Sequence, residues 1–490
     1  MQLSRLLDNV QRTSTENVPG IELRGLAYDS RKVEPGYLFV AVKGEKTDGN
    51  LFAAQAVERG AAAILSENVV PASFSGCWIQ VDNARRALAM AAASFYEHPT
   101  RSFELIGITG TNGKTSTAYL LESILLAARE RVGVVSTIEY RGPEGAMPAE
   151  RTTPESLDLQ ALFAQFVRQR CRFVVMEVSS HALDMERVHA CRFRSAVFTN
   201  LTQDHLDYHR TMESYFRAKQ RLFLGTGLGV PAQSLINRDD PRAAALEAAC
   251  SGRCLTYSID GGADFQMLET RLEKKGAWLR VLAAGKAFEM QTRLLGKPNL
   301  SNVLAAVAAA SDLGIDVAAI QQGIEDCPAI PGRFEWIDRG QPFQVFVDYA
   351  HTPDALQKVL QTALELRPNR LLVVFGCGGE RDRAKRSAMA AIAEKLADFC
   401  WITSDNPRSE DPLRILDEIA TGFTSRSPRY RTEPDRRRAI RDALGEARPG
   451  DVVVIAGKGH ETYQALADRT IRFDDREEAR LALGELGFSS

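Results

Sequence analysis

The sequence predicts an α/β protein of three domains, and three observations carry that prediction. First, 490 residues exceed what one ordinary hydrophobic core encloses. Second, from about residue 103 short apolar runs alternate with helical patterns, which is typical of parallel strands covered on both faces. Third, the same alternation of short apolar runs and helical patterns begins again after "IPGRFEW". The predicted domains are 1–98, 99–332 and 333–490.

Composition narrows the classes of protein and of partner. Lys and Arg total 61 against 63 for Asp and Glu, a net charge of −2, which gives no electrostatic footprint for nucleic acid or an anionic membrane. No apolar run approaches the ~18 residues of a membrane span, and the N-terminus shows no secretory signal. The eight cysteines are scattered without a CxxC pair, and Cys171, Cys377 and Cys400 adjoin apolar runs. We expect buried free thiols and a cytoplasmic location.

The first domain is expected to be a small α/β unit. "YLFVAV" and "AAAILSE" have the composition of strands, and "LFAAQAVERG" has a helical pattern between them. The unit closes at "YEHPTRS", where Pro99 discourages continuation of a helix.

The central domain is expected to hold a parallel sheet. Its strands are "ELIGIT", "VGVVST", "FVVMEV" and "SAVFTN", each a nearly continuous apolar run. Residues 254–295 alternate polar and apolar residues, which predicts antiparallel strands added to this sheet. "NLSNVLAAVAAASDLGI" follows as a helix ending near Gly314.

The C-terminal domain is expected to be a Rossmann-like α/β unit. Its strands are "FQVFVDYA", "LLVVFG", "FCWITS" and "VVVIAG", and polar or glycine-rich loops follow them. Ligands bind at the carboxyl ends of the strands in open parallel sheets, so these loops are candidate binding segments.

The stretch "ELIGITGTNGKTSTAYLLESIL" predicts a phosphate site, although the first glycine of the common phosphate-loop pattern is missing. Gly110 and Gly113 let backbone N–H groups turn toward a phosphate at the positive end of the next helix. Lys114 adds a charge for the outer phosphates, and the Thr115 hydroxyl suits Mg²⁺. The alternative is a tight turn with a solvated lysine.

Two further strand ends carry groups that could bind metal. Glu177 ends a buried strand, where an unpaired carboxylate is costly, so it is either a Mg²⁺ ligand or half of a buried salt bridge. The segment "NLTQDHLDYH" ends another strand with Asp204, His205, Asp207 and His209. These residues allow a zinc site, a solvated histidine pair, or, next to Glu177, a group near a second metal or a phosphate.

Lys219 follows in "SYFRAKQRLF", an amphipathic helical pattern. On physical grounds alone it is predicted to be a surface lysine.

The motifs taken together resemble the Mur ligases, in order and over nearly the whole chain. They are "YDSR", "GTNGKT", "TTP", "MEVSSH", "NLTQDHLDYH", "YFRAKQRLF", "PGRFE", "DYAHTPDAL", "GCGGERDRAKR", "DNPR" and "GKGHE". The family's own loop is G-T-N-G-K-T, so the missing glycine belongs to its pattern. Within the family the chain is similar to the ligases that join UDP-N-acetylmuramoyl-L-alanyl-D-glutamate to a diamino acid in peptidoglycan precursor synthesis.

The resemblance implies a reaction. ATP phosphorylates the glutamyl carboxylate, and an amine then attacks the acyl phosphate to give an amide, ADP and phosphate. The catalytic residues implied are Lys114, Glu177, His205 and Lys219. Thr115 and Glu177 are expected to hold one Mg²⁺, and a second is expected near His205 and Lys219. Lys219 is implied to be carbamylated (N6-carboxylysine, from CO₂).

The resemblance also assigns the nucleotide and the nucleotide sugar. For ATP it implies Gly110, Thr111, Asn112, Gly113, Lys114, Thr115, Ser116, Asn299, Asn302, Arg333 and His351. For the nucleotide sugar it implies Tyr28, Ser30, Glu45, Lys46, Thr47, Thr152, Thr153, Ser179 and Arg187. The alternative for Arg187 is a helix-surface arginine, and turn or cap roles are the alternatives for the residues on the adenine side.

The C-terminal domain is expected to select the amine. The implied residues are Arg381, Asp405, Asn406, Pro407, Arg408, Gly457 and Glu461. "DNPR" marks the family members that add meso-diaminopimelate, whose extra carboxylate an arginine can clamp with two hydrogen bonds. Glu461 is expected to favour the ligand's distant ammonium. The alternative is an Asp-Asn-Pro turn with no ligand.

Other functions remain open from the sequence. Within the family the alternatives are a lysine-adding ligase, a folylpolyglutamate synthase or the ligase that adds D-alanyl-D-alanine. Outside it, the alternative is a phosphate-loop kinase or NTPase that forms no amide. We expect a monomer whose third domain closes over ATP and acceptor, with no nucleic-acid partner and no membrane insertion.

Overall fold

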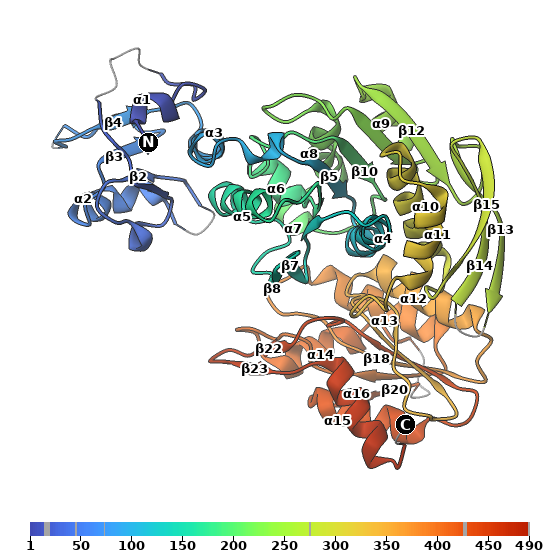
Figure 1. The fold of residues 1–490 in the computed structure, drawn as a ribbon. Helices are drawn as coiled ribbons and strands as arrows, with labels where there is room; N and C mark the ends of the chain where they lie inside the picture. The colour runs from blue at the N-terminus through green and yellow to red at the C-terminus, as the bar shows by residue number, and fades with distance from the viewer. Residues whose placement is uncertain (14–19, 45–46, 73, 274–275, 425–428, 489–490) are drawn as a thin grey trace.

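The computed structural model describes residues 1–13, 20–44, 47–72, 74–273, 276–424 and 429–488. Three large sheets and one two-stranded sheet organise the described chain (Figure 1). The N-terminal part lies to one side and reaches the rest through α3, while the C-terminal part packs below the central sheet. Within the described residues no helix is both long enough and apolar enough to cross a membrane.

The N-terminal sheet has four parallel strands in the order β1-β2-β3-β4. The predicted helix at 51–60 is a 3-10 turn up to Phe52 and an α-helix only from Ala53, because the Asp48 side chain caps the 3-10 turn at the Asn50 N–H. The elements are α1 (Leu3–Leu6), β1 (Gly25–Ala27), η1 (Ser30–Lys32), β2 (Tyr37–Val40), η2 (Gly49–Phe52), α2 (Ala53–Glu58), β3 (Ala63–Ser66), β4 (Trp78–Gln80), α3 (Ala84–Phe95) and η3 (Pro99–Arg101).

The central sheet has eleven strands in the order β15-β14-β13-β12-β11-β10-β5-β9-β6-β7-β8. Its middle, from β12 to β6, is parallel, as the apolar runs predict. These strands are β5 (Glu104–Thr109), β6 (Val132–Val135), β9 (Phe173–Glu177), β10 (Ser195–Phe198), β11 (Gln233–Asn237) and β12 (Arg253–Ser258).

Both edges of this sheet differ from the prediction. The alternating segment at 254–295 is antiparallel only for β13 (Phe265–Glu273), β14 (Gly276–Ala283) and β15 (Lys286–Thr292), because β12 still pairs in parallel with β11 and β13. At the other edge, β7 (Glu139–Gly142) and β8 (Gly145–Pro148) form an antiparallel hairpin that the sequence did not reveal.

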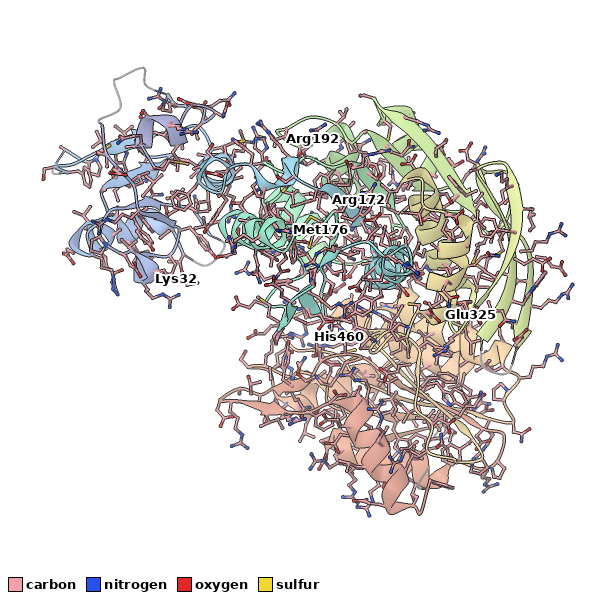
Figure 2. All side chains as sticks on the ribbon, in the orientation of Figure 1. Lys32, Arg172, Met176, Arg192, Glu325 and His460 are labelled. Carbon is pink, nitrogen blue, oxygen red and sulfur yellow. The ribbon has the colours of Figure 1, made fainter. Side chains whose placement is uncertain are left out.

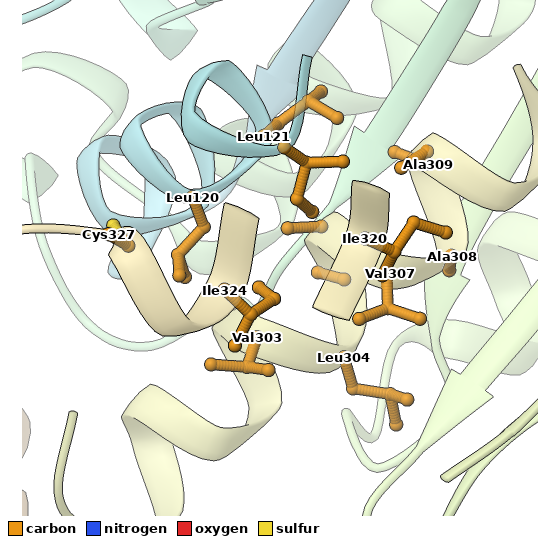
Figure 3. Close-up of a cluster of buried hydrophobic side chains, with 14 of the residues drawn as sticks. Leu120, Leu121, Val303, Leu304, Val307, Ala308, Ala309, Ile320, Ile324 and Cys327 are labelled. Atoms are coloured by element: carbon orange, nitrogen blue, oxygen red, sulfur yellow. The ribbon is translucent and has the colours of Figure 1, made fainter. Parts of the chain in front are cut away.

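Three helices form the main core on one face of this sheet: α4 (Lys114–Ala127), α10 (Lys297–Asp312) and α11 (Val317–Asp326). Figure 3 shows Leu120 and Leu121 of α4 packed against Val303 and Val307 of α10 and Ile324 of α11. The opposite face is covered by α5 (Ser156–Arg168), α6 (Ser180–Asp184) and α8 (Met212–Leu224). Two short helices, α7 (Leu206–His209) and α9 (Ala243–Ala249), complete this part.

The C-terminal sheet has six strands in the order β16-β17-β21-β18-β19-β20, and all pairs except β16·β17 are parallel. Its strands are β16 (Glu335–Trp336), β17 (Gln344–Asp348), β18 (Leu371–Phe375), β19 (Phe399–Ile402), β20 (Tyr430–Thr432) and β21 (Val452–Ala456), with a separate pair, β22 (Tyr463–Ala465) and β23 (Thr470–Arg472). The helices are α12 (Pro353–Glu365), α13 (Ala384–Leu396), α14 (Pro412–Ala420), α15 (Arg436–Glu446) and α16 (Asp475–Glu485).

All eight cysteines are free thiols. The expected burial of Cys171, Cys377 and Cys400 is confirmed. Three others are only half-buried: Cys77, Cys250 and Cys254.

Candidate active site

The glycine loop joins the end of β5 to the start of α4. Gly113 lies in the left-handed region at φ 88°, and a Cβ there would come within 2.3 Å of Asn302 Oδ1, so only glycine fits. The Lys114 ammonium folds over the loop and donates to the carbonyls of Gly110 (2.9 Å) and Thr111 (2.8 Å). The alternative of a solvated lysine is therefore wrong, because Lys114 is held against the loop.

A cavity of about 240 Å³ lies over this loop. The residues expected to bind ATP come from four separate segments of the chain, and all but Gly110 line it: Thr111, Asn112, Gly113, Lys114, Thr115, Ser116, Asn299, Asn302, Arg333 and His351. Arg333, from the C-terminal part, donates to Thr115 Oγ1 at 3.1 Å. Burial lowers the pKa of Lys114, opposed by the charges of Glu177 and Asp204.

Glu177 ends β9, is fully buried and also lines the smaller cavity. Its carboxylate accepts from the Thr137 backbone N–H (2.9 Å) and the Thr137 hydroxyl (3.0 Å). The salt-bridge alternative is wrong, since its partners are neutral groups. Sequence reasoning missed Thr137; the adjacency of β6 and β9 in the sheet, had it been known, would have placed the two strand ends together.

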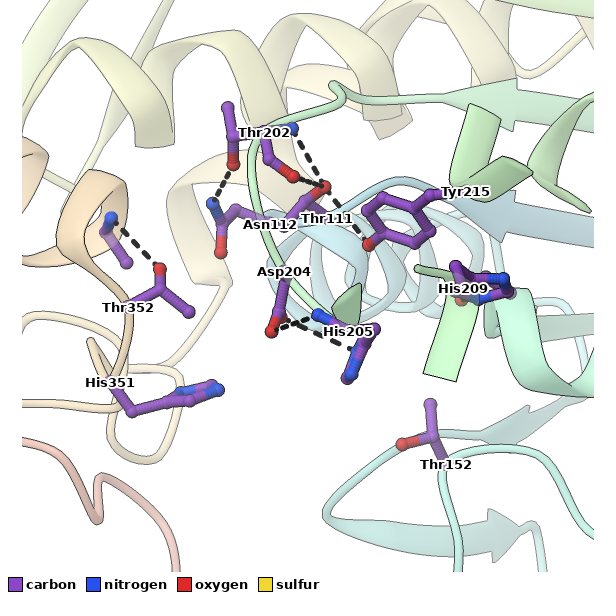
Figure 4. Close-up of polar contacts among 12 residues, drawn as sticks. Thr111, Asn112, Thr152, Thr202, Asp204, His205, His209, Tyr215, His351 and Thr352 are labelled. Atoms are coloured by element: carbon purple, nitrogen blue, oxygen red, sulfur yellow. Dashed lines mark hydrogen bonds and ion pairs between the residues drawn. The ribbon is translucent and has the colours of Figure 1, made fainter. Parts of the chain in front are cut away.

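The second strand end forms a polar cluster beside the loop (Figure 4). Asp204 accepts from the His205 N–H at 2.8 Å, and His205 itself lies at φ 54°. Burial lowers the pKa of His205 to about 3 although Asp204 opposes it. His209 bonds Ser180 Oγ at 2.9 Å and stacks on Tyr215, so it is not a solvated histidine.

The zinc alternative finds no geometric basis. Across the part of the chain that the structure describes, no group of three or more His, Cys, Asp and Glu side chains is placed to hold a metal ion. A site of one carboxylate and one hydroxyl beside a phosphate pocket does fit Mg²⁺, which is commonly held by one or two carboxylates together with substrate phosphates. Glu177 and Thr115 supply those two groups in one cavity.

Lys219 is not on the surface, and that prediction is wrong. It lies on the inner side of α8, with 2% of its surface exposed, and its Nζ donates to the Gly110 carbonyl at 2.7 Å. The Tyr215 ring centroid lies 4.6 Å from Nζ. Burial, and then the neighbouring Lys114, hold the pKa of Lys219 well below its usual range. Such an amine is readily deprotonated and therefore nucleophilic.

The residues expected to bind the nucleotide sugar are divided between two places. Thr152 and Ser179 line the smaller cavity. Thr153 lies just behind, where its hydroxyl donates to the Glu177 carbonyl at 2.8 Å. Arg187 is buried, donates to the Thr153 carbonyl at 3.0 Å and pairs with Glu155 at 2.8 Å, so the helix-surface alternative is wrong.

The other described residues of this group, Tyr28, Ser30 and Thr47, belong to the N-terminal part and line neither cavity. Tyr28 reaches the central part, donating from its hydroxyl to Asp158 on α5 at 2.5 Å. Ser30 donates to Gln55 at 2.8 Å, and Thr47 is exposed. Glu45 and Lys46 lie outside the described residues.

A larger cavity, of about 910 Å³, lies between the central and C-terminal parts. It shares Thr137, Thr152, Asp204, His205, Tyr349 and His351 with the smaller cavity, so the two adjoin. Its lining includes six of the residues expected to bind the amine: Arg381, Asp405, Asn406, Arg408, Gly457 and Glu461. Pro407 is the exception. His460, labelled in Figure 2, lies on the C-terminal side of this space.

"DNPR" is both a turn and a cavity wall. Glu410 N–H donates to the Pro407 carbonyl at 3.1 Å, as in a turn, while Arg408, at φ 54°, donates to the Gly379 carbonyl at 2.7 Å. The cavity is also lined by residues that sequence reasoning missed, among them Lys385, Tyr349 and three residues of β8, namely Ala146, Met147 and Pro148. No local signal marks these residues, because the packing of two distant segments brings them to the cavity.

A phosphate loop with a buried lysine and carboxylate, adjoining a second polar cavity between two α/β units, defines a nucleotide-dependent enzyme with a separate acceptor site. The family comparisons agree. Models described as "Mur ligase family, catalytic domain", "Mur ligase middle domain" and "Mur ligase, glutamate ligase domain" match residues 22–96, 108–310 and 332–459. The chain belongs to the Mur ligase family, whose members are ATP-dependent amide ligases.

Two full-length relatives carry the same name, UDP-N-acetylmuramoyl-L-alanyl-D-glutamate–2,6-diaminopimelate ligase. The protein of Solibacter usitatus is 46% identical over 100% of this chain and 99% of its own length. That of Gloeobacter violaceus is 46% identical over 99% of each. A solved structure of a ligase with this name is 33% identical, covers 99% of both chains and has a TM-score of 0.71.

Proposed function

We propose that this enzyme joins meso-2,6-diaminopimelate to the glutamyl carboxylate of UDP-N-acetylmuramoyl-L-alanyl-D-glutamate at the expense of ATP. The observation that carries the proposal is the adjoining pair of cavities. Lys114 and Glu177 line one, Lys219 donates to the Gly110 carbonyl of its loop, and Arg408 and Glu461 line the other. The names of the full-length relatives support the same substrates.

The reaction has two steps. A carboxylate oxygen of the acceptor takes the γ-phosphoryl group of ATP, releasing ADP and leaving an acyl phosphate. The free amine then attacks the acyl carbon, the C–O bond to phosphate breaks, and an amide, phosphate and a proton are released. Lys114 lies where it can neutralise phosphate oxygens once it leaves the loop carbonyls.

Glu177 and Thr115 are proposed to hold Mg²⁺, which when bound supplies charge neutralisation for phosphate oxygens. The backbone N–H and the hydroxyl of Thr137 donate to the Glu177 carboxylate and hold it in place. His205 and a carbamate on Lys219 are proposed to serve a second Mg²⁺. The lowered pKa of Lys219 supports carbamate formation, because only the neutral amine reacts with CO₂.

Each part of the chain is proposed to bind one substrate. Residues 1–98 take the nucleotide sugar with Thr152, Thr153, Ser179 and Arg187, residues 99–332 take ATP, and residues 333–490 take the amine. The two-nitrogen fork of Arg408 suits the extra carboxylate of diaminopimelate. We place the enzyme in the cytoplasm as a monomer, a location that its eight free thiols support.

The test is phosphate release from ATP with the nucleotide-sugar dipeptide, in parallel reactions with meso-diaminopimelate, L-lysine and no amine, with the product identified by mass. We expect amide formation with diaminopimelate alone. The Arg408→Met variant should lose at least about tenfold in kcat/KM for diaminopimelate, while its KM for ATP is retained.

The outcomes separate the alternatives. Equal kcat/KM for lysine would identify a lysine-adding ligase and remove the role of Arg408. ATP hydrolysis that is independent of both acceptor and amine would identify an NTPase.

A further inference from the structure

Lys458 is a fully buried lysine that no part of the proposed function uses. It lies in the loop after β21, between Gly457 and Gly459, and its side chain has no exposed surface. Removing an ammonium group from water is costly unless charged and hydrogen-bonding partners replace the water. The groups that bind the Lys458 ammonium therefore indicate the role of this residue.

The partners form a closed triangle. Lys458 Nζ donates to Asn406 Oδ1 at 3.1 Å and to Glu461 Oε2 at 3.0 Å. Asn406 Nδ2 donates to the same Glu461 Oε2 at 2.8 Å. The Ala465 N–H also donates to Asn406 Oδ1, at 2.9 Å, which fixes which way the amide points. Every corner of the triangle is thus held by the other two.

Two corners face the larger cavity and the third does not. Asn406 and Glu461 line it, whereas Lys458 lies behind them and is not part of the wall. Within the described residues both hydrogen bonds to the Glu461 carboxylate fall on Oε2, so Oε1 is the oxygen left for a ligand. Lys458 can therefore affect a ligand only through its neighbours.

Lys458 also acts on the carboxylate next to the triangle. Burial raises the pKa of Asp405, but the charges of Lys458, Arg436 and Lys385 and the hydrogen bond from the Asn406 N–H together leave that pKa below its usual value. Arg436 is itself held by Asp475 at 2.7 Å and by the Ala456 carbonyl at 2.9 Å. Arg436 is thus held in place by partners of its own. Lys458, in contrast, contacts the cavity-lining residues Asn406 and Glu461 directly.

We infer that Lys458 is a positioning residue that determines specificity for the amine. By holding Oε2 of Glu461 and Oδ1 of Asn406, it aims Oε1 at the far end of the substrate and makes the site require an ammonium group there. The inference rests on the proposed function. It assigns to Arg408 the far carboxylate and to the Lys458–Asn406–Glu461 triangle the far ammonium.

The experiment compares two amines in the wild type and in Lys458→Met, which keeps a similar length without the charge. One amine is meso-diaminopimelate, and the other is 2-aminopimelate, which keeps both carboxylates and lacks the far amino group. We expect Lys458→Met to raise KM for diaminopimelate at least about tenfold, with kcat changed less than about threefold. The preference for diaminopimelate over 2-aminopimelate should fall by a similar factor, and KM for ATP should be unchanged.

The pair Arg370–Asp451 provides a matched control, because Asp451 directly precedes β21 whereas Lys458 lies just after its end. Arg370 pairs with buried Asp451 at 2.5 Å, and neither residue lines either cavity. Arg370→Met also removes a cation from a buried carboxylate, so it should lower the melting temperature while leaving the preference between the two amines intact. A general loss of stability is thereby separated from a loss of positioning.

A double variant tests the route of the effect. If Lys458 acts through Glu461, then Lys458→Met should change the preference little in a Glu461→Gln background, because coupled sites are not additive. Should Lys458→Met not fold, Lys458→Gln is measured in the same way.

Unchanged KM and unchanged preference in a folded Lys458 variant would overturn the inference and leave the proposed function standing. So would full additivity with Glu461→Gln. A wild-type enzyme that forms no amide with diaminopimelate overturns both.

Discussion

At the scale of single residues, Lys219 shows how position changes chemistry. Its ammonium would be an ordinary cation in water, but the interior of α8 puts it against the Gly110 carbonyl and beside Lys114. Because burial holds the pKa of Lys219 well below its usual range, more of this amine is neutral than in a lysine exposed to water. The neutral amine can add to CO₂, forming a C–N bond and releasing a proton.

We expect Lys219→Ala to lose nearly all ligase activity while keeping its fold. Wild-type enzyme prepared without CO₂ should lose activity and regain it with bicarbonate, and ¹³C-labelled bicarbonate should give a carbamate resonance that Lys219→Ala lacks. Near-wild-type turnover by that variant, or the same resonance in it, would contradict the assignment.

Sequence alone placed Lys114, Glu177 and Thr115 at one site, because each follows a strand or opens a helix at the same edge of a parallel sheet. It misplaced Lys219, because an amphipathic pattern does not tell which face a lone lysine occupies when Tyr215 and Leu222 are buried around it. It also missed Thr137 and Lys458, whose roles depend on partners about 40 and 50 residues away in the chain.

At the scale of elements, the crossing of α11 over α4 depends on one glycine. A Cβ at Gly323 would come within 2.3 Å of the Ile124 Cα, and the Gly323 carbonyl accepts from Ser123 Oγ at 2.7 Å. The two helix backbones are therefore in direct contact. Alanine is the better helix former, but here the steric conflict is with backbone, which cannot rotate away.

We expect Gly323→Ala to lower the free energy of unfolding by about 2 kcal/mol or more, measured by urea denaturation. Gly484, in α16, has no atom within 4 Å of an added Cβ, so Gly484→Ala should instead raise stability by about 0.5 kcal/mol. A destabilisation of the same size in both variants would show that packing at Gly323 is not the cause.

Most strands could be predicted from the sequence, but the strands at one edge of the central sheet could not. The apolar runs located the parallel strands of the central and C-terminal sheets because strands buried on both faces leave a strong signal. The β7–β8 hairpin gave no such signal. Its strands have four residues each, β7 is half-buried and β8 is exposed, yet both contribute residues to the lining of the larger cavity. Its existence depends on pairing with β6 rather than on its own composition.

At the scale of the whole molecule, Glu186 ties the N-terminal part to the central one. It pairs with Arg86 of α3 at 2.9 Å, with Arg221 of α8, and with His189 at 3.2 Å. Burial alone would raise the pKa of Glu186, but these partners hold it at about 2. The folded-state pKa is below the ordinary value of 4.5, so the stabilisation is present above pH 4.5 and is lost as the pH falls toward 2.

We expect Glu186→Gln to destabilise the protein by about 2 kcal/mol at pH 7 and by much less at pH 2.5, measured from melting curves at both values. Glu213→Gln, which breaks an exposed ion pair on the same α8 helix, should cost little at either pH. Equal destabilisation by Glu186→Gln at both pH values would exclude the linkage.

The adjoining cavities belong to this largest scale, and sequence reasoning could name their walls only through family resemblance. No spacing within the chain tells that Arg381 and Thr152 share a cavity. The shared cavity arises because the central and C-terminal sheets, which are separate sheets, pack against each other.

One contact links the two sheets to the smaller cavity. Arg333 lies in the short segment between α11 and β16, the covalent passage from the central to the C-terminal sheet, and it donates to Thr115 Oγ1. A ligand that engages the Thr115 hydroxyl competes with this guanidinium. Ligand binding in this cavity and the relative orientation of the two sheets therefore both involve the Arg333 side chain. The two equilibria are linked, so a change in one shifts the other.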